Sequence, residues 1–190
     1  MTRRSSLVGI IGLAMATVGF ISYAIVVAST NGANSTSGTF PKVPPASALG
    51  RGHRVPSFDL PRLGGGSSVS PRDGSQPIVI NFFASWCHDC VAELNAFGEV
   101  SNHSSGVHFV GIDALDSNPR LALTLLRDAH IRYPIGVDSN GSIAQRYLIA
   151  ALPVTFFVSR SGVVKGELIG RATVRALASW VRYLGGSTTS

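Results

Sequence analysis

Nearly unbroken runs of apolar residues, many of them β-branched, recur along the chain from residue 78 onward. They lie at residues 78–83 (IVINFF), 107–112 (VHFVGI) and 154–159 (VTFFVS). Runs of this length are typical of strands that are covered on both faces of a sheet. A fourth run, 163–170 (VVKGELIG), follows the third across a short turn that contains glycine, which predicts a hairpin. The pattern therefore predicts a sheet with buried central strands.

Apolar residues at helical spacing fill the segments between and after these runs. Asn118 suits the cap and Pro119 the first position of a helix, whose apolar stripe contains Leu121, Ala122, Leu125, Leu126 and Ala129. Thr173 suits the cap of a last helix that stops at a glycine pair, with a stripe made of Val174, Leu177, Ala178, Val181 and Leu184. Strands and helices in this order predict an α/β domain with a central mixed β-sheet flanked by helices.

The most apolar stretch lies near the start of the chain, where residues 7–28 carry no charge over 22 positions. A helix of this length measures about 33 Å, which is enough to cross a hydrocarbon core of about 30 Å. Arg3 and Arg4 precede the stretch, and the next basic residue is Lys42. This asymmetry places residues 1–6 in the cytoplasm and the remainder outside. The sequence predicts a single-pass signal anchor in the cell membrane.

A cleaved secretory signal that ends at Ala28 is the alternative, and it also leaves the domain outside the cytoplasm. Residues 29–54 are rich in Ser, Thr, Asn, Gly and Pro, a composition typical of a flexible linker. The last six residues, 185–190, predict a disordered tail. The folded domain is therefore expected at residues 55–184.

The positive charge of the chain is concentrated in its first part. The net charge is +6, but Arg3, Arg4, Lys42 and Arg51 precede residue 53 and no acidic residue does. The remaining 12 basic residues stand against 10 acidic ones, a net of +2. The domain also has no basic run and no aromatic residues interleaved with arginines, so nucleic acid is not an expected partner.

The chain contains only two cysteines, Cys87 and Cys90, in the segment NFFASWCHDCVAEL. Outside the cytoplasm they are expected to oxidise, and each has only the other as a partner. A disulfide that closes so short a loop constrains the unfolded chain little, so a purely structural role explains the pair poorly. Zinc needs at least three protein ligands, and only His88 is close in the sequence, so no metal site is predicted.

The remaining interpretation is redox chemistry, which needs no cofactor here. A C-x-x-C pair that follows a strand and opens a helix puts the first sulfur at the helix N-terminus. Unpaired N–H groups and the helix dipole stabilise a thiolate at that place. Cys87 is then the exposed nucleophile, and Cys90, one turn deeper on the same face, is positioned to resolve a mixed disulfide.

These residues resemble the thioredoxin fold, and in particular the membrane-tethered TlpA/ResA/CcmG-type thiol–disulfide oxidoreductases. The resemblance covers residues 55–184 and rests on W-C-x-x-C at 86–90 and P-x-T-F at 153–156. It implies an N-terminal β-hairpin addition. Residues 55–61 (VPSFDLP) resemble its entry strand, and residues 65–70 (GGSSVS) resemble its turn and second strand.

The resemblance also implies roles for single residues. Pro153 matches the family's cis-proline, which faces the sulfurs, so the backbone of Leu152 is expected to pair with an extended substrate strand. Trp86 matches the tryptophan that shields the sulfurs. Glu93 matches an acidic residue near the active site, three positions after Cys90. Partial burial should raise the pKa of Glu93 and allow it to exchange a proton with Cys90.

The sequence departs from the family between and before the cysteines. The intervening dipeptide is His88–Asp89, where the family often has proline second. A protonated His88 favours the Cys87 thiolate and an ionised Asp89 opposes it, so the redox tuning stays open at this point. Asn81 occupies the place where thioredoxins carry a buried acid, and this increases the expected importance of Glu93.

The leading hypothesis is an extracytoplasmic thiol–disulfide oxidoreductase that reduces the disulfides of exported proteins. The resemblance implies that the substrate is the C-x-x-C-H haem-attachment site of apocytochrome c during cytochrome c maturation. It also implies that a membrane thiol carrier of the CcdA/DsbD type is the electron donor.

Two alternatives stay open. The first is an oxidase that forms disulfides in exported proteins. The second is a copper or haem chaperone that uses Cys87, Cys90 and His88 as soft ligands. A peroxiredoxin is disfavoured, because residues 84–86 ahead of Cys87 do not supply a Thr-x-x-Cys site.

Overall fold

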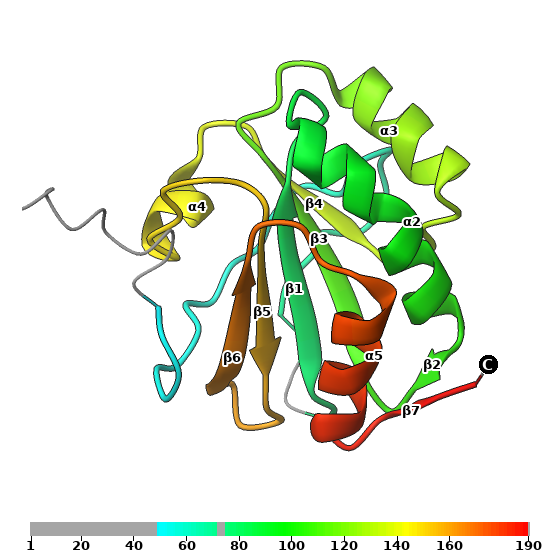
Figure 1. The fold of residues 1–190 in the computed structure, drawn as a ribbon. Helices are drawn as coiled ribbons and strands as arrows, with labels where there is room; N and C mark the ends of the chain where they lie inside the picture. The colour runs from blue at the N-terminus through cyan, green and yellow to red at the C-terminus, as the bar shows by residue number, and fades with distance from the viewer. Residues whose placement is uncertain (1–48, 72–74, 190) are drawn as a thin grey trace, which may run out of the picture. The chain divides into compact units, whose positions relative to one another are not determined.

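A five-stranded sheet in the order β4-β3-β1-β5-β6 forms the centre of the domain (Figure 1). The structure is a computed structural model that describes residues 49–71 and 75–189. The strands are β1 (Ile78–Phe83), β3 (His108–Ala114), β4 (Ile135–Asp138), β5 (Val154–Val158) and β6 (Val164–Ile169). The first three are parallel to one another, while β5 is antiparallel to β1 and β6 is antiparallel to β5. The predicted α/β class with a central mixed sheet is confirmed.

The central strand β1 explains the long apolar run in the sequence. Its register runs from Ile78 opposite His108 to Phe83 opposite Asp113 on one side. On the other side it pairs with β5. Because β1 has neighbours on both edges and helices or loops on both faces, all six of its residues are buried.

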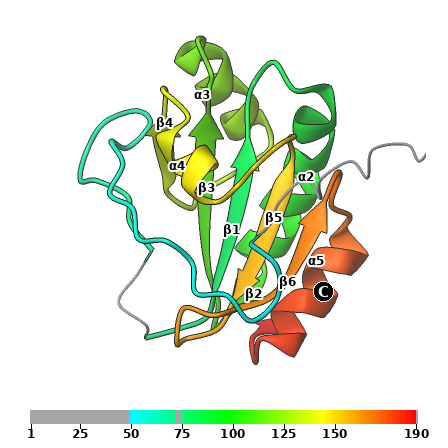
Figure 2. The ribbon, with the colours of Figure 1, turned by 90° about the vertical axis from the view of Figure 1, so that its left-hand side faces the viewer.

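Helices cover both faces of the sheet. The helices α2 (His88–Asn102), α3 (Pro119–Asp128) and α5 (Val174–Tyr183) lie on one face, and the short α4 (Ser142–Arg146) lies on the other (Figures 1 and 2). Alternate residues of β1 therefore enter different cores. Phe82 packs with Tyr147, which follows α4, whereas Val79 packs with α2 and α5.

The predicted helix starts are confirmed. The side chain of Asn118 accepts a hydrogen bond from the N–H of Leu121, and Pro119 is the first residue of α3. The side chain of Thr173 accepts one from the N–H of Ala176 at the start of α5. Each cap satisfies an N–H group that has no partner inside its helix.

Both predicted edges of the folded domain need correction. Leu49 is buried, the N–H of Gly52 donates to Val164, and the N–H of Val164 donates to His53, so the fold includes part of the expected linker. At the other end, β7 (Ser187–Thr188) pairs with β2 (Ser104–Ser105), so these residues are not a disordered tail. Backbone pairing orders both segments, and their polar composition gives no sign of it.

The implied N-terminal hairpin is present only as one antiparallel residue pair, in which the backbones of Leu60 and Val69 exchange two hydrogen bonds. The anchor expected at residues 7–28 lies outside the described residues. In the part of the chain that the structure describes, no helix is both long and apolar enough to cross a membrane.

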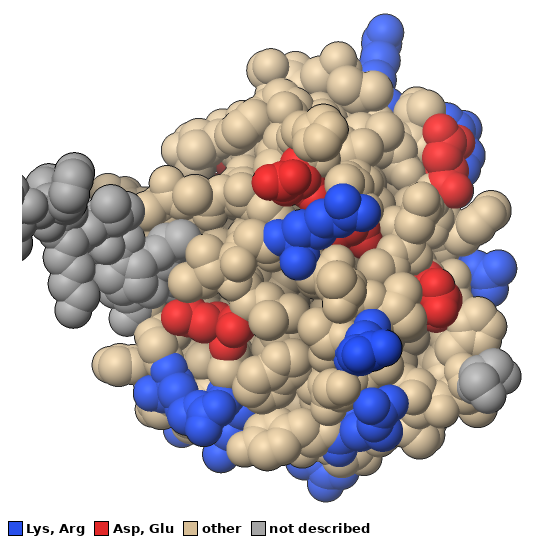
Figure 3. Space-filling view, viewed as in Figure 1, with Lys and Arg blue, Asp and Glu red and all other residues tan. Residues whose placement is uncertain are grey.

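Both signs of charge are present on the face of the domain shown in Figure 3. Lys and Arg and Asp and Glu lie scattered over a mainly uncharged surface, with Lys and Arg more frequent in the lower part of the view. This distribution agrees with the small net charge of +2 that the sequence gives from residue 53 onward, with 12 basic and 10 acidic residues.

Candidate functional site

The two cysteines lie where β1 ends and α2 begins. Cys87 is the N-cap residue of α2, and its Sγ accepts a hydrogen bond from the N–H of Cys90 at 3.2 Å. The expected disulfide between them is present, with an S–S distance of 2.06 Å and a Cα–Cα distance of 5.2 Å. The first sulfur is therefore held at the positive end of the helix dipole, which favours a thiolate.

Solvent reaches the two sulfur-bearing residues to different extents. Cys87 is 8% exposed, which is less than its expected role as an exposed nucleophile suggested, and Cys90 is fully enclosed. Both belong to a cluster with Phe83, Leu94 and residues of α3. An attacking group from outside can therefore meet only Cys87, while Cys90 is confined to reacting with its neighbour.

The dipeptide between the cysteines points into solvent. The side chains of His88 and Asp89 are 97% and 65% exposed, and the His88 Nδ1 lies 3.6 Å from the Asp89 Oδ1. Water and salt screen charges at such positions. The opposing influences of these two residues on Cys87 are therefore weak, and each also reduces the other.

Three residues are expected to bind substrate beside the cysteines. The Trp86 side chain is 61% exposed, and its indole Nε1–H donates a hydrogen bond to the carbonyl oxygen of Leu115 at 3.1 Å. The peptide bond between Leu152 and Pro153 is cis, as the resemblance implied. Pro153 is buried, and Leu152 is half-buried against the cluster that contains both cysteines. Trp86 directly precedes Cys87 in the chain, and Leu152, which precedes Pro153, packs against the cluster that contains both cysteines.

Glu93 lies inside the domain, one turn below Cys90. It is 1% exposed. Its Oε1 accepts a hydrogen bond from the Nδ2 of Asn81 at 2.9 Å, and its Oε2 accepts one from the N–H of Ala172 at 2.7 Å. Burial raises the pKa of Glu93 to about 7, although these hydrogen bonds and the charge of Arg171 oppose the rise. The carboxyl group is thus present in both protonation states at neutral pH.

Two further carboxyl groups lie close to the cysteines and were not predicted from the sequence. Asp113 is the register partner of Phe83, and Asp116 accepts a hydrogen bond from the N–H of Ser85, two residues before Cys87. Both acids are buried. The available signal was the position of Asp113 directly after the apolar run at residues 107–112, at the end of a strand predicted to be buried.

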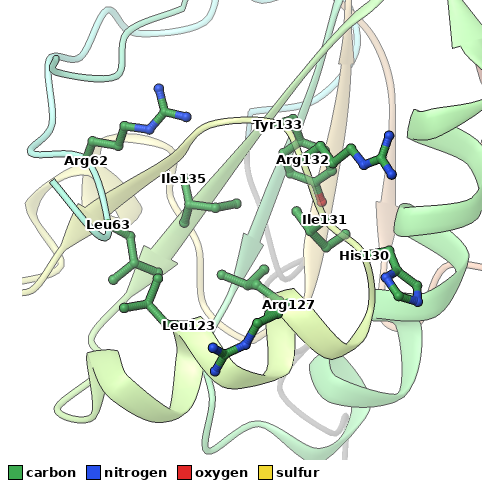
Figure 4. Close-up of a pocket in the computed structure, with 10 residues that line it drawn as sticks. Arg62, Leu63, Leu123, Arg127, His130, Ile131, Arg132, Tyr133 and Ile135 are labelled. Carbon is green, nitrogen blue, oxygen red and sulfur yellow. The ribbon is translucent and has the colours of Figure 1, made fainter. Parts of the chain in front are cut away.

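One pocket of the domain lies away from the sulfurs. The pocket in Figure 4 has a volume of about 390 Å³ and lies between α3 and the segment that leads into β4. It is lined by Arg62, Leu63, Leu123, Leu126, Arg127, His130, Ile131, Arg132, Tyr133 and Ile135. Neither cysteine lines it, so this pocket is separate from the thiol site.

Comparisons with known proteins agree with this site. The AhpC/TSA family matches residues 51–166. Sporulation thiol-disulfide oxidoreductase A of Bacillus subtilis (strain 168) is 26% identical over 130 residues, which cover 66% of this chain and 79% of that protein. Thiol-disulfide oxidoreductase ResA of Bacillus thuringiensis subsp. konkukian is 23% identical over 135 residues, which cover 70% of this chain and 78% of that protein.

A solved structure supports the fold. The structure of a thiol:disulfide interchange protein of the thioredoxin family from Chlorobium tepidum TLS matches with a TM-score of 0.62 at 23% identity. The match covers 70% of this chain and 97% of that one. The thioredoxin-type fold is therefore confirmed.

Proposed function

The chain belongs to the AhpC/TSA family and is a thiol–disulfide oxidoreductase with a thioredoxin fold, and we propose that it reduces disulfides of exported proteins outside the cytoplasm. The observation that carries the proposal is the unequal placement of the two cysteines. Cys87 caps α2 and is 8% exposed, whereas Cys90, three residues further on, is fully enclosed. A pair of this kind has one nucleophile for substrates and one thiol reserved for resolution.

The reaction starts from the reduced pair. The Cys87 thiolate attacks one sulfur of a substrate disulfide, and the substrate S–S bond breaks as a mixed disulfide forms. The released substrate thiolate takes up a proton. Cys90 then loses its proton and attacks the Cys87 sulfur, which frees the second substrate thiol. Two electrons pass to the substrate, and the Cys87–Cys90 disulfide is the product.

Glu93 is the proposed acceptor of the Cys90 proton. It lies one turn further along the same helix, and its pKa of about 7 leaves much of it ionised at neutral pH. A base with a pKa near the working pH is the most effective kind. In the reverse reaction Glu93 returns the proton to Cys90.

The substrate is proposed to bind as an extended segment beside the sulfurs. The half-buried Leu152 and the exposed Trp86 border Cys87, and the backbone at Leu152 is the proposed partner of a substrate strand. The proposed substrate class includes the oxidised C-x-x-C-H site of apocytochrome c. A membrane thiol carrier is the proposed source of electrons, and the anchor expected at residues 7–28 keeps the domain near that carrier.

The direction of electron flow is tested by the redox potential of the full chain, equilibrated in detergent with glutathione buffers. A reductant should have a reduction potential of about −270 mV, the value typical of thioredoxin. A potential near about −120 mV, which is typical of a strong oxidant, would reverse the proposed direction. Reduction of a peptide with an oxidised C-x-x-C-H site then tests the substrate class, with a scrambled-spacing peptide as the control.

A further inference from the structure

Two buried carboxyl groups lie under the thiol loop and have no part in the reaction described above. Asp113 is near the end of β3, opposite Phe83 of β1. Cys87 follows Phe83 after three residues, and Asp116 follows Asp113 after two. Since β1 and β3 are parallel neighbours, both segments leave the sheet at the same edge. The Asp113–Asp116 segment therefore supports the loop that carries Cys87.

Asp116 is bonded directly to that loop. Its Oδ2 accepts a hydrogen bond from the N–H of Ser85, and its Oδ1 accepts one from the N–H of Asn118 at 2.8 Å. A second bond joins the same two segments, from the Trp86 indole to the carbonyl oxygen of Leu115 at 3.1 Å. Ser85 and Trp86, the two residues immediately before Cys87, are thus both hydrogen-bonded to residues 115–116. The bond to Asp116 is the one whose acceptor is a carboxylate.

Asp113, unlike Asp116, is buried without any described residue that donates a hydrogen bond to it. It is 1% exposed, and in the ranges 49–71 and 75–189 neither of its carboxyl oxygens has a hydrogen-bond donor. An ionised carboxylate without donors is costly to bury. A protonated Asp113 has a donor of its own, and the Asp116 carboxylate is the acceptor beside it.

The electrostatics of the two groups agree with one shared proton. Burial, followed by the charge of Asp116, raises the pKa of Asp113 to about 8. Burial also acts to raise the pKa of Asp116, but hydrogen bonds from Ser85, Asn118 and Asp113 outweigh it and hold the pKa below its ordinary value. Two adjacent carboxyl groups with pKa values driven apart in this way are the usual signature of a proton held between them.

No neighbouring cation neutralises the pair. Among the described residues, the groups that shift either pKa include no Lys, Arg or His. The other acids near the cysteines, Asp89 and Glu93 on α2, also affect neither group. The shared proton and the hydrogen bonds from Ser85 and Asn118 therefore set the charge state of the pair.

We propose that Asp113 and Asp116 share one proton and act as positioning residues, so that protonated Asp113 supports Asp116 while Asp116 holds the Ser85–Cys87 segment at the start of α2. The inference rests on the proposed role of Cys87 as the nucleophile. Loss of the proton leaves two adjacent buried negative charges, whose repulsion is relieved when the Asp116 side chain turns away from Asp113 and gives up its hydrogen bond from the N–H of Ser85. The contacts of Trp86 and the position of Cys87 at the helix end change together.

The test follows Trp86 in the oxidised chain, where no thiol titrates. The chain has two tryptophans, and Trp180→Phe leaves Trp86 as the only one while keeping a ring against Phe157. The emission of Trp86 is recorded from about pH 5 to about pH 9.5, below the ordinary titration of tyrosine. We expect a step with a midpoint at about pH 8, the value of the Asp113 carboxyl group.

Two further substitutions, each made in the Trp180→Phe chain, identify the carboxyl group that causes the fluorescence step. Asp113→Asn provides a permanent amide donor to Asp116 and should abolish the step. Glu93→Gln is the matched control, because it removes the other buried carboxyl group that titrates near neutrality and should leave the step in place. A flat titration of the parent chain, or a step that survives Asp113→Asn, overturns the proposal.

If the Asp113→Asn variant does not fold, an infrared spectrum can detect the proton on Asp113 without that substitution. In the Glu93→Gln chain at about pH 6.5, ordinary carboxyl groups are ionised, so a carbonyl band of a protonated carboxylic acid reports Asp113. The band should disappear by about pH 9.5, and its absence at the lower pH overturns the proposal.

The positioning role has its own measurement. In the reduced chain, Asp116→Asn should slow iodoacetamide alkylation of Cys87 by about tenfold relative to Asp113→Asn, because a hydrogen bond to a charged group contributes roughly this factor or more. Equal rates in the two variants overturn the role. The fluorescence and infrared tests use no substrate, so their failure leaves the reductase proposal intact, and an oxidising redox potential leaves the shared proton intact.

Discussion

Glu93 illustrates how one side chain can serve both the fold and the chemistry. Its two oxygens are fixed by Asn81 and by the N–H of Ala172, which tie α2 to β1 and to the segment before α5. The same burial that makes these bonds valuable raises the pKa of Glu93 to about 7. A group with this pKa accepts a proton at neutral pH without a large free-energy cost.

Replacing this carboxyl group should slow the resolving step selectively. Glu93→Gln keeps an acceptor for Ala172 but cannot take the Cys90 proton, so breakdown of the Cys87 mixed disulfide should slow by about 100-fold. The rate should also lose its dependence on a group that titrates near pH 7. Stopped-flow measurement with a disulfide peptide reports both quantities.

A matched control lies on the same helix. Glu99→Gln removes an exposed carboxylate from α2 and should leave the rate and its pH dependence unchanged. If Glu93→Gln behaved like Glu99→Gln, the assignment of Glu93 as the proton acceptor would be wrong.

The two raised carboxyl pKa values also predict how stability depends on pH. Glu93 and Asp113 have pKa values of about 7 and about 8 in the folded chain, and both are near 4 in the unfolded chain. Between these limits the folded state holds more protons than the unfolded state. The contribution of each group is therefore complete below about pH 4 and is lost as the pH rises through its folded pKa.

Urea unfolding of the oxidised chain should show this loss directly. Between about pH 5 and about pH 7 the free energy of unfolding should fall by roughly 1.4 kcal/mol per pH unit for each group, as an upper limit. The double variant Glu93→Gln, Asp113→Asn should remove most of the slope. Stability that rises over this range in the parent chain contradicts the two raised pKa values.

At the scale of elements, long apolar strands and capped helices could be predicted, and short elements could not. The six buried residues of β1 and the caps at Asn118 and Thr173 are local signals that tertiary contacts reinforce. The strand β4 was not predicted because it has only four residues. It also contains Gly136, where a side chain would be too close to Leu60, because a Cβ at Gly136 would lie 2.9 Å from the Leu60 Cβ. Such a contact leaves no periodic pattern in the sequence.

The contact between α2 and the end of α3 gives a test at this scale. A Cβ at Gly98, within α2, would overlap the carbonyl oxygen of Ala129, which follows α3. Gly to Ala in a helix ordinarily stabilises by about 1 kcal/mol. Here the clash should reverse the sign, and Gly98→Ala should lower the free energy of unfolding by about 1–3 kcal/mol.

Denaturant unfolding checks the sign, and Asn95→Ala provides the comparison. Asn95 is exposed on the same helix, so its replacement by a better helix former should be neutral or slightly stabilising. If Gly98→Ala also stabilised the chain, α2 and α3 would not be as close as the structure places them.

At the scale of the whole molecule, the site joins residues that the sequence could identify with residues that it could not. Cys87, Cys90 and Glu93 share one helix, and their spacing predicted one face. Asp113 and Asp116 reach the same place from another strand and loop, which only the parallel pairing of β1 and β3 brings together. The residues on α2 can be identified from one segment of the sequence. Asp113 and Asp116 can be placed beside them only when the order of the strands in the sheet is known.

The whole arrangement has one chemical purpose in this account, to keep the Cys87 sulfur ionised at the N-terminus of α2. The N–H of Cys90 already points at that sulfur, and the loop before it is held by Asp116 and Leu115. The Cys90 N–H and the helix N-terminus favour the thiolate over the neutral thiol, and the bonds to Asp116 and Leu115 keep the loop in place.

The pH dependence of Cys87 alkylation in the Cys90→Ala chain tests this claim most directly. Without a second thiol, the rate follows the ionisation of Cys87 alone. We expect a midpoint below about pH 7.5 and a reaction at neutral pH that is faster than that of an unperturbed thiol, whose pKa is about 8.5. A midpoint at or above about pH 8.5 would contradict the account, because Cys87 would then be an ordinary thiol.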